Sequence, residues 1–452
     1  MPTLIRGGHV VTSAQGRLPA VIADGAVLVE GDLIAEVGDY PALRAAHPAA
    51  EVVGGPHDIL TAGFVNTHGH FSEGLITGMA EEYTLWEWLE ALIHRVDPHL
   101  DRQMAEVGTL MSGVQMLRSG ITTTNDMFCS DPGRDAPLTP GVVNALDLLG
   151  LRGVLSFGAG DVGSDRGIEA EFEEHEALRE AVAGSRRSLF RVGVGAVGGQ
   201  SDAMFARSVA YATGLGVGVH IHLQEVREEV TATFQARGVT PTRFCAREGL
   251  FAAPTIAAHC VWVDRHDREL FAEHRVGVAH NPVSNMILAS GAAPVAEFRA
   301  LGVDVGIGVD GAASNDSQDM IQAIKAASLL ARVHHQQATA MSAAEALELA
   351  TIGGARALRL EESIGSLEVG KQADLVRFDG ESPALACTHD PVQAVVNIAG
   401  SREVADVWVG GERVLRDGEV ATVDVAEVVA RARPLAAELV ARAGLHHLSG
   451  WR

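Results

Sequence analysis

Lysine is nearly missing from this sequence of 452 residues, which has only Lys325 and Lys371. Lysine and arginine together number 35 against 58 aspartates and glutamates, so the formal net charge is −23. A surface of this sign repels phosphate, so we expect neither nucleic acid nor an anionic membrane as a partner. The longest run without charged residues, 276–296, contains two prolines and two asparagines, so no membrane span is predicted.

Cysteine and aromatic residues are also scarce, at four cysteines and 5% aromatics. Cys129, Cys245, Cys260 and Cys387 lie far apart and form no CxxC pair, and the N-terminus has no secretory signal core. The sequence therefore predicts a reduced, cytoplasmic protein. Hydrophobic residues make up 47% of the chain, which is typical of a globular protein with a large core.

Both ends of the chain read as short β-strands between glycine turns. Such runs fill the first 58 residues and return after residue 360, for example at 374–378, 395–398 and 404–409. We expect one small β-sandwich formed by both ends and interrupted by a large insertion. The predicted division is 1–58, 59–360 and 361–452, and the last part ends in a helix at 425–443.

Short apolar strands alternate with amphipathic helical segments through the middle of the chain. The expected strands are 63–67, 121–126, 153–157, 191–196, 218–223, 255–259, 276–280 and 303–310. Eight such strands over about 300 residues predict a (β/α)8 TIM barrel. A doubly wound sheet is disfavoured because no GxGxxG opens a helix after the first strand.

Histidine pairs end two of these strands. His68 and His70 follow the first, and His220 and His222 end the fifth. Alternate side chains of a strand point the same way, so each pair can face one site, and neutral imidazole is a common metal ligand. For the HxH spacing alone, a metal half-site and a polar strand end are about equally good interpretations. We interpret His220 as packed inside the barrel, one layer below His222.

Three further polar residues lie at strand ends. Glu225 follows His222 and could reach a water beside a metal, although it could also begin an ordinary acidic helix. His259 closes the sixth strand, and Asp310 closes the eighth, where burying a carboxylate is costly unless it is paired or metal-bound. All the candidates fall at the carboxyl ends of predicted strands, where barrel enzymes place their sites.

Seven segments together resemble the amidohydrolase superfamily, in particular its aminoheterocycle deaminases and triazine hydrolases. The matching segments are 61–70, 220–225, 258–260, 280–285, 308–316, 350–355 and 365–375. The resemblance implies that one divalent metal, zinc or else iron, is held by His68, His70, His222 and Asp310. It further implies that Glu225 carries a proton to a ring nitrogen, that His259 orients the water, and that Asp310 also accepts a proton.

Binuclear members of the superfamily bridge two metals through a modified lysine on a middle strand. No lysine precedes Lys325 here, so we expect a single metal. The resemblance also implies substrate contacts at Trp88, Asp97 and Ser314. The alternative interpretation of Trp88 is that it packs its helix, expected at 85–93, against the barrel.

The expected reaction is deamination of an aminated N-heterocycle of purine, pterin or triazine type, in which hydroxide on the metal attacks the ring carbon and ammonia leaves. A smaller ring than a nucleoside is favoured because the arginine and Gly-Pro-His typical of the nucleoside enzymes are missing. The alternatives are a triazine hydrolase that expels chloride or an alkylamine, and an inactive scaffold. The scaffold is disfavoured because every ligand residue is present. The resemblance also implies a homo-oligomer, a dimer or larger.

Overall fold

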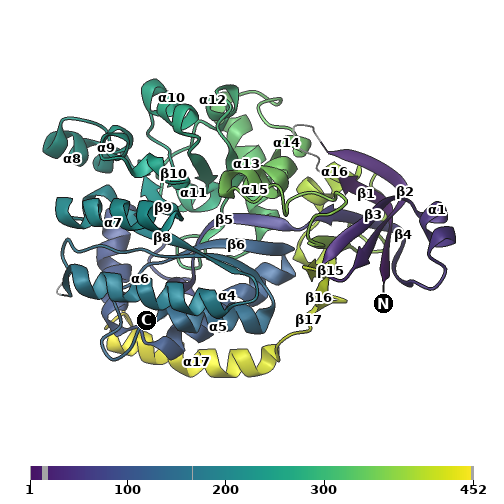
Figure 1. The fold of residues 1–452 in the computed structure, drawn as a ribbon, viewed down its shortest axis with the longest axis horizontal. Helices are drawn as coiled ribbons and strands as arrows, with labels where there is room; N and C mark the ends of the chain where they lie inside the picture. The colour runs from purple at the N-terminus through teal and green to yellow at the C-terminus, as the bar shows by residue number, and fades with distance from the viewer. Residues whose placement is uncertain (1, 13–18, 165, 449–452) are drawn as a thin grey trace.

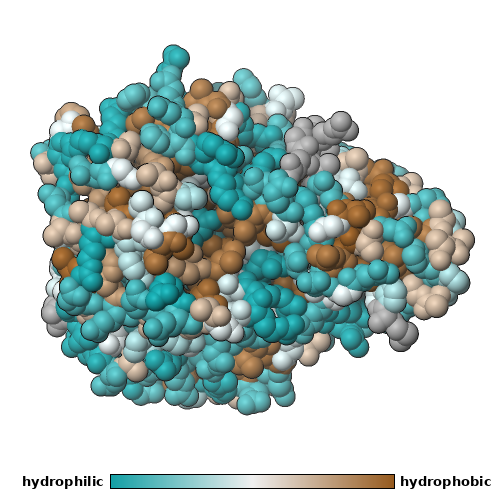
Figure 2. Space-filling model, viewed as in Figure 1, coloured by the Kyte–Doolittle hydropathy of each residue, from teal (hydrophilic) through white to brown (hydrophobic). Residues whose placement is uncertain are grey.

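A barrel and a separate sheet make up the chain, in a computed structural model that describes residues 2–12, 19–164 and 166–448. In Figure 1 the sheet lies to the right of the barrel, and the last helix runs along the bottom of the molecule. No helix among these residues is long and apolar enough to cross a membrane. Most of the face drawn in Figure 2 is hydrophilic, in keeping with the charge of the chain.

The barrel consists of parallel strands in the order β12-β11-β10-β9-β8-β7-β6-β5-β13. Their bounds are β5 (Phe64–His70), β6 (Ile121–Phe128), β7 (Arg152–Phe157), β8 (Ser188–Ala196), β9 (Gly218–Leu223), β10 (Thr255–His259), β11 (Gly277–His280), β12 (Val305–Ile307) and β13 (Asp310–Gly311). Because β12 pairs with β11 while β13 pairs with β5, the sheet closes into a ring. The predicted barrel is confirmed.

The eighth strand differs from its prediction, because it is split into β12 and β13 instead of running unbroken over 303–310. At the break, a Cβ on Gly308 would lie 2.2 Å from Asn281 Oδ1 and 2.9 Å from His68 Cβ. Asp310 then has a φ of +63°, which is rare for a residue other than glycine. The split turns the Asp310 carboxylate toward the histidines of β5.

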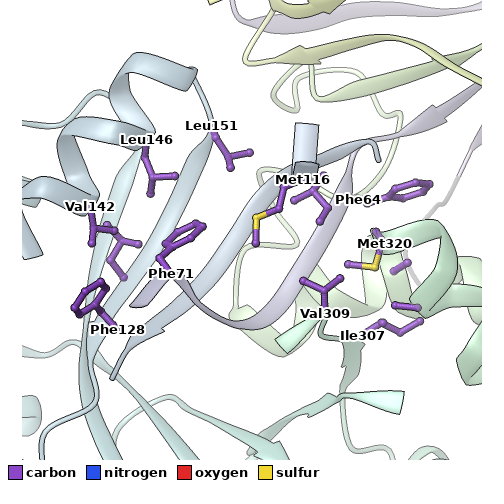
Figure 3. Packing of buried hydrophobic residues seen from close by; sticks show 14 of the residues in the cluster. Phe64, Phe71, Met116, Phe128, Val142, Leu146, Leu151, Ile307, Val309 and Met320 are labelled. Atoms are coloured by element: carbon purple, nitrogen blue, oxygen red, sulfur yellow. The ribbon is translucent and has the colours of Figure 1, made fainter. Parts of the chain in front are cut away.

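Helices surround the barrel strands. They are α2 (Leu85–Trp88), α3 (His94–Val96), α4 (Arg102–Arg118), α5 (Thr139–Leu149), α6 (Gly167–Gly184), α7 (Asp202–Leu215), α8 (Arg227–Arg237), α9 (Pro241–Arg247), α10 (Arg265–His274), α11 (Pro282–Ile287), α12 (Val295–Ala300), α13 (Met320–His335), α14 (Ala343–Glu348) and α15 (Gly354–Leu358). Figure 3 shows part of the resulting core, in which Phe64 of β5, Met116 of α4 and Leu146 of α5 belong to one buried cluster.

The chain ends form one eight-stranded sheet, in the order β17-β16-β15-β14-β4-β1-β2-β3. Its strands are β1 (Thr3–Thr12), β2 (Ala20–Glu30), β3 (Leu33–Asp39), β4 (Glu51–Ala62), β14 (Leu375–Phe378), β15 (Val404–Val409), β16 (Glu412–Arg416) and β17 (Glu419–Val420). The two ends meet where β4 pairs with β14, for example Ala62 with Leu375. The predicted joint β unit is confirmed, and the residue boundaries given for the three parts stay a prediction.

The remaining elements are short helices and the C-terminal helix. They are α1 (Tyr40–Ala46), α16 (Pro391–Gln393) and α17 (Val425–Arg442). The strand predicted at 395–398 is wrong, because residues Ala394–Ile398 form a π-helical turn that continues α16. The reason is local, since the Asp390 side chain accepts from the N–H groups of Val392 and Gln393 and starts a helix there.

Candidate active site

Four side chains from three parts of the barrel meet at the carboxyl ends of the strands. His68 and His70 end β5, His222 lies near the end of β9, and Asp310 opens β13. His70 Nε2 is 3.1 Å from His222 Nε2, and Asp310 Oδ1 is 3.3 Å from His68 Nε2 and 3.4 Å from His70 Nε2. The strand register explains the meeting, because Asp310 pairs opposite Gly69, between the two histidines of β5.

The backbone fixes the proton positions of two of these histidines. His70 Nδ1 lies 2.6 Å from the main-chain oxygen of Met127, and His222 Nδ1 lies 2.6 Å from that of Gly195. A carbonyl can only accept, so both Nδ1 atoms carry the proton, and in the neutral rings both Nε2 atoms carry a lone pair. Two lone pairs that face each other at 3.1 Å cannot hydrogen-bond, and a cation between them removes the conflict.

The third histidine is oriented by a side chain instead of the backbone. His68 Nδ1 is 2.8 Å from His220 Nε2, and His220 Nδ1 is 3.1 Å from Ser156 Oγ. Ser156 donates its own proton to the main-chain oxygen of Asp126. Donation from His68 to His220, and from His220 to Ser156, leaves His68 Nε2 free for the site, where this buried atom has no hydrogen-bond partner among the described residues.

The geometry fits a divalent metal. Two ligand atoms held about 2.0–2.1 Å from one metal, at a tetrahedral angle, lie about 3.3 Å apart. The separations of 3.1–3.4 Å agree with this spacing. Ligand atoms of His68, His70 and His222 lie within 4.8 Å of one another, as do those of His68, His259 and Asp310. The structure therefore brings together all four predicted ligands, with His259 beside them.

Glu225 and His259 form a second pair next to these ligands. His259 Nε2 is 3.6 Å from Glu225 Oε2 and 3.8 Å from Asp310 Oδ2. Its other nitrogen, Nδ1, is 2.9 Å from Asn285 Oδ1, so Asn285 can accept the Nδ1 proton and fix the ring. Glu225 and His259 are 4% and 2% exposed, so their charges act in a nearly water-free environment.

Burial and neighbouring charges set the proton affinities in the site. Burial lowers the pKa of His68 to about 4 and also lowers the pKa of His70 and His222, which keeps the imidazoles neutral as metal binding requires. Burial alone would raise the pKa of Asp310, but His68 and the other histidines outweigh it and hold that pKa well below its usual range.

The pKa values of Glu225 and His259 are both raised. Burial raises the pKa of Glu225, so this carboxyl takes up a proton more readily than an exposed glutamate does. Burial alone would lower the pKa of His259, but the carboxylates of Glu225 and Asp310 outweigh it and raise that pKa. A carboxyl group with a raised pKa beside a basic histidine is suited to proton transfer.

The residues predicted to contact substrate lie in different surroundings. Trp88 is buried in the hydrophobic core, whereas Trp86 is 47% exposed. Burial, with Asp131 and Glu73 nearby, raises the pKa of Asp97 well above its usual range. Ser314 donates its main-chain N–H to Glu73 Oε2, so it borders the site through the loop after Asp310. Substrate contact by these three residues stays a prediction.

Sequence reasoning missed several residues that support the site. Asn285, Ser290 and Glu73 were not singled out, and His220 was interpreted only as packing. Glu73 accepts from the main-chain N–H groups of Ala313 and Ser314, and burial raises its pKa to about 8. The only signal for His220 was its HxH spacing. Ser290 lies in a loop, and Asn285 and Glu73 lie in short helical turns after strand ends, where no hydrophobic periodicity marks them.

Comparison with known proteins agrees with this geometry. The profile described as "Amidohydrolase family" matches residues 59–414, which include every residue of the site. The chain belongs to the amidohydrolase family. A profile described as an imidazolonepropionase-like composite domain of bacteria also matches residues 25–50.

Individual amidohydrolases are similar along nearly their whole length. The 5-methylthioadenosine/S-adenosylhomocysteine deaminase of Desulforudis audaxviator is 37% identical over 443 residues, covering 97% of this chain and 99% of that protein. An adenosine deaminase from Xanthomonas campestris, solved with bound zinc, has a TM-score of 0.89 at 30% identity, covering 97% and 98%. Atrazine chlorohydrolase from Arthrobacter aurescens, complexed with zinc, shares the fold, with a TM-score of 0.85 at 23% identity and coverage of 96% and 100%.

Proposed function

We propose that this amidohydrolase is a metal-dependent hydrolytic deaminase of an aminated N-heterocycle of purine, pterin or triazine type. The observation that carries the proposal is the placement of Glu225 Oε2 3.6 Å from His259, directly beside the cluster of three histidines and Asp310. The deaminase names of the similar proteins support it. The reaction adds water to a ring carbon, protonates a ring nitrogen and releases the amino group as ammonia.

One divalent cation would be held by His68, His70, His222 and Asp310, with zinc proposed ahead of iron because similar structures contain zinc. When bound, the cation acts as a Lewis acid and lowers the pKa of a coordinated water toward neutrality. A site with two metals bridged by a modified lysine is not proposed, because no lysine precedes Lys325.

The protein's own groups would move the protons. Glu225 accepts a proton from the attacking water and donates it to the ring nitrogen, which weakens the aromatic resistance of the ring to attack. His259, fixed by Asn285, orients the water and donates toward the oxygen that becomes negative. Asp310 accepts the second water proton and passes it to the amino group, and the C–N bond then breaks, which releases ammonia and leaves a carbonyl group on the ring.

Trp88, Asp97 and Ser314 are proposed as residues that contact the substrate. The sheet formed by the chain ends exposes three hydrophobic residues, Val21, Leu33 and Val52, and Figure 2 also shows hydrophobic residues there. This exposed hydrophobic surface supports our proposal of a homo-oligomer. Light scattering of the purified protein measures its mass and therefore its oligomeric state.

The division of the chain at residues 58 and 360 and a cytoplasmic location remain proposals.

The test is a panel of rings with the metal content measured in the same preparation. The panel contains aminated purines, pterins and triazines, a 5′-modified adenosine, and atrazine. We expect ammonia from at least one aminated ring, and none after chelation of the metal. Chloride or alkylamine release without ammonia would favour a triazine hydrolase, and turnover by metal-free protein would refute the proposal.

A further inference from the structure

The last turn of α11 and the residues that follow it contact both side chains to which we assign proton transfer. Asn285 Oδ1 lies 2.9 Å from His259 Nδ1, and Ser290 Oγ donates to Glu225 Oε1 at 2.8 Å. The main chain joins the two, because the N–H of Ser290 donates to the main-chain oxygen of Asn285 at 2.9 Å. We refer to residues 285–290 as the bracket turn.

The bracket turn is held in an unusual conformation by neighbouring residues. The indole Nε1 of Trp262 donates to the main-chain oxygen of Ser290 at 2.8 Å, and the guanidinium of Arg227 lies 4.0 Å from the centre of the Trp262 ring system. On either side of Ser290, Ala289 has a φ of +54° and Gly291 a φ of +122°. A residue other than glycine adopts positive φ at a cost that surrounding contacts must offset, and such strain gathers at functional sites.

The contact with Ser290 makes the two carboxylate oxygens of Glu225 unequal. Oε1 accepts from the Ser290 hydroxyl, whereas Oε2 lies 3.6 Å from His259 Nε2. The main chain of Glu225 is fixed as well, because its N–H donates to Glu229 Oε2 at 3.0 Å. Rotation of the carboxyl group would break the bond to Ser290 at a site that is 3–4% exposed, where no bulk water replaces it.

We propose that Ser290 is a positioning residue that reserves Oε2 of Glu225 for the moving proton. The proposal rests on the proposed deaminase function, because it assigns Ser290 to the proton path of that reaction. Ser290 acts through Glu225. Without its hydroxyl, the carboxyl group can turn out of its plane and the proton can rest on either oxygen, so the oxygen that faces His259 carries the proton for only part of the time.

Steady-state kinetics of three variants test the proposal. We expect Ser290→Ala to lower kcat by about 10- to 100-fold, part of the usual contribution of general acid–base catalysis, with KM changed less than about threefold. Ser290→Thr keeps the hydroxyl and should recover most of the activity. Ser328→Ala is the matched control, because Ser328 is also fully buried but donates to the main-chain oxygen of Met341 in the outer helix layer. Metal content should stay unchanged in all three.

A double mutant separates positioning from a general loss of structure. In a Glu225→Gln background, Ser290→Ala should lower the remaining activity less than about twofold, because the group that it positions is already disabled. Wild-type turnover in Ser290→Ala, or an equal loss in both backgrounds, would overturn the inference.

A crystal structure of Ser290→Ala gives a readout that needs no substrate. We expect the plane of the Glu225 carboxyl group to turn or to become disordered relative to His259, and an unchanged carboxyl group would overturn the inference. If the wild type releases ammonia from no ring, the deaminase proposal fails, while the orientation of Glu225 in this crystal still decides the role of Ser290.

Discussion

Asp310 and Asp406 are both buried, but their neighbours differ. Asp406, in the sheet of the chain ends, is fully buried and forms ion pairs with Arg377 and Arg413, whose charges are permanent. Asp310, in the barrel, faces three imidazoles instead. The paired aspartate is complete within the protein, whereas Asp310, which faces His68 and His70 in their neutral form, needs a cation from outside. The residues around a buried carboxylate, arginines or histidines, thus distinguish a structural ion pair from a metal site.

Replacing each aspartate by asparagine tests this distinction most directly. We expect Asp310→Asn to lose its metal and at least about 1000-fold of the activity, with little change in melting temperature. Asp406→Asn should keep the metal and instead lose about 3–5 kcal/mol of unfolding free energy, because Arg413 loses its buried partner and Arg377 keeps only Asp58 as a buried partner. Elemental analysis and denaturant unfolding of both variants measure the two effects. Metal loss in Asp406→Asn would contradict the comparison.

Glu225→Gln separates proton transfer from metal binding within the barrel site. We expect full metal content and a kcat lower by about 10²- to 10⁴-fold, because the amide cannot carry the proton. The reaction needs the ionised carboxylate first, so activity should fall as the pH drops through the pKa of Glu225. Burial raises that pKa, so the fall should come at a higher pH than for an exposed glutamate, and the variant should lack it. A pH profile identical to that of the wild type would remove Glu225 from the proton path.

His220 tests whether the metal site depends on a side chain behind it. His68 is oriented by His220, whereas His70 and His222 are oriented by main-chain oxygens. We expect His220→Leu to weaken zinc binding by about 10- to 100-fold in chelator competition, because His68 loses the acceptor for its Nδ1 proton. His220→Gln offers a carbonyl acceptor and should lose less. Equal zinc affinity in wild type and His220→Leu would contradict the role.

The smallest expected effect concerns the stability of the fold and comes from His175, a buried histidine outside the metal site. It is fully buried among Phe157, Phe172 and Tyr211, neither ring nitrogen has a hydrogen-bond partner among the described residues, and burial lowers its pKa to about 4. In the unfolded chain His175 binds a proton below about pH 6.5, whereas in the folded chain it does so only near pH 4. The free energy of unfolding is therefore highest above pH 6.5 and decreases as the pH falls toward 4.

His175→Phe should remove that sensitivity to acid. At pH 5 the cost of keeping His175 neutral is about 2 kcal/mol, so the variant should gain stability relative to the wild type between pH 8 and pH 5. Urea unfolding at both values measures the change. An equal difference between the proteins at the two pH values would show that His175 does not titrate on unfolding.

The barrel and its ligands could be predicted because their signals are local. Buried parallel strands read as apolar runs, and the period of two residues places His68 and His70 on one face. Ser290 and Glu225 are 65 residues apart and come into contact only in the folded protein, so their spacing in the sequence does not predict the contact. The split eighth strand depends on the approach of Gly308 to Asn281, and the helical turn at 394–398 on a cap formed by Asp390. These features are decided by tertiary contacts and capping, which outweigh the pattern of hydrophobic residues.

The pairing of β4 with β14 has a consequence for how the chain acquires its shape. The backbone bonds between residues 59–62 and 375–378 cannot form until everything between them has been synthesised. All four ligand positions lie inside that interval, so the two arms of the sheet can pair only after every ligand residue has been synthesised. Non-local pairing of this kind forms slowly, because the long intervening chain must be ordered first.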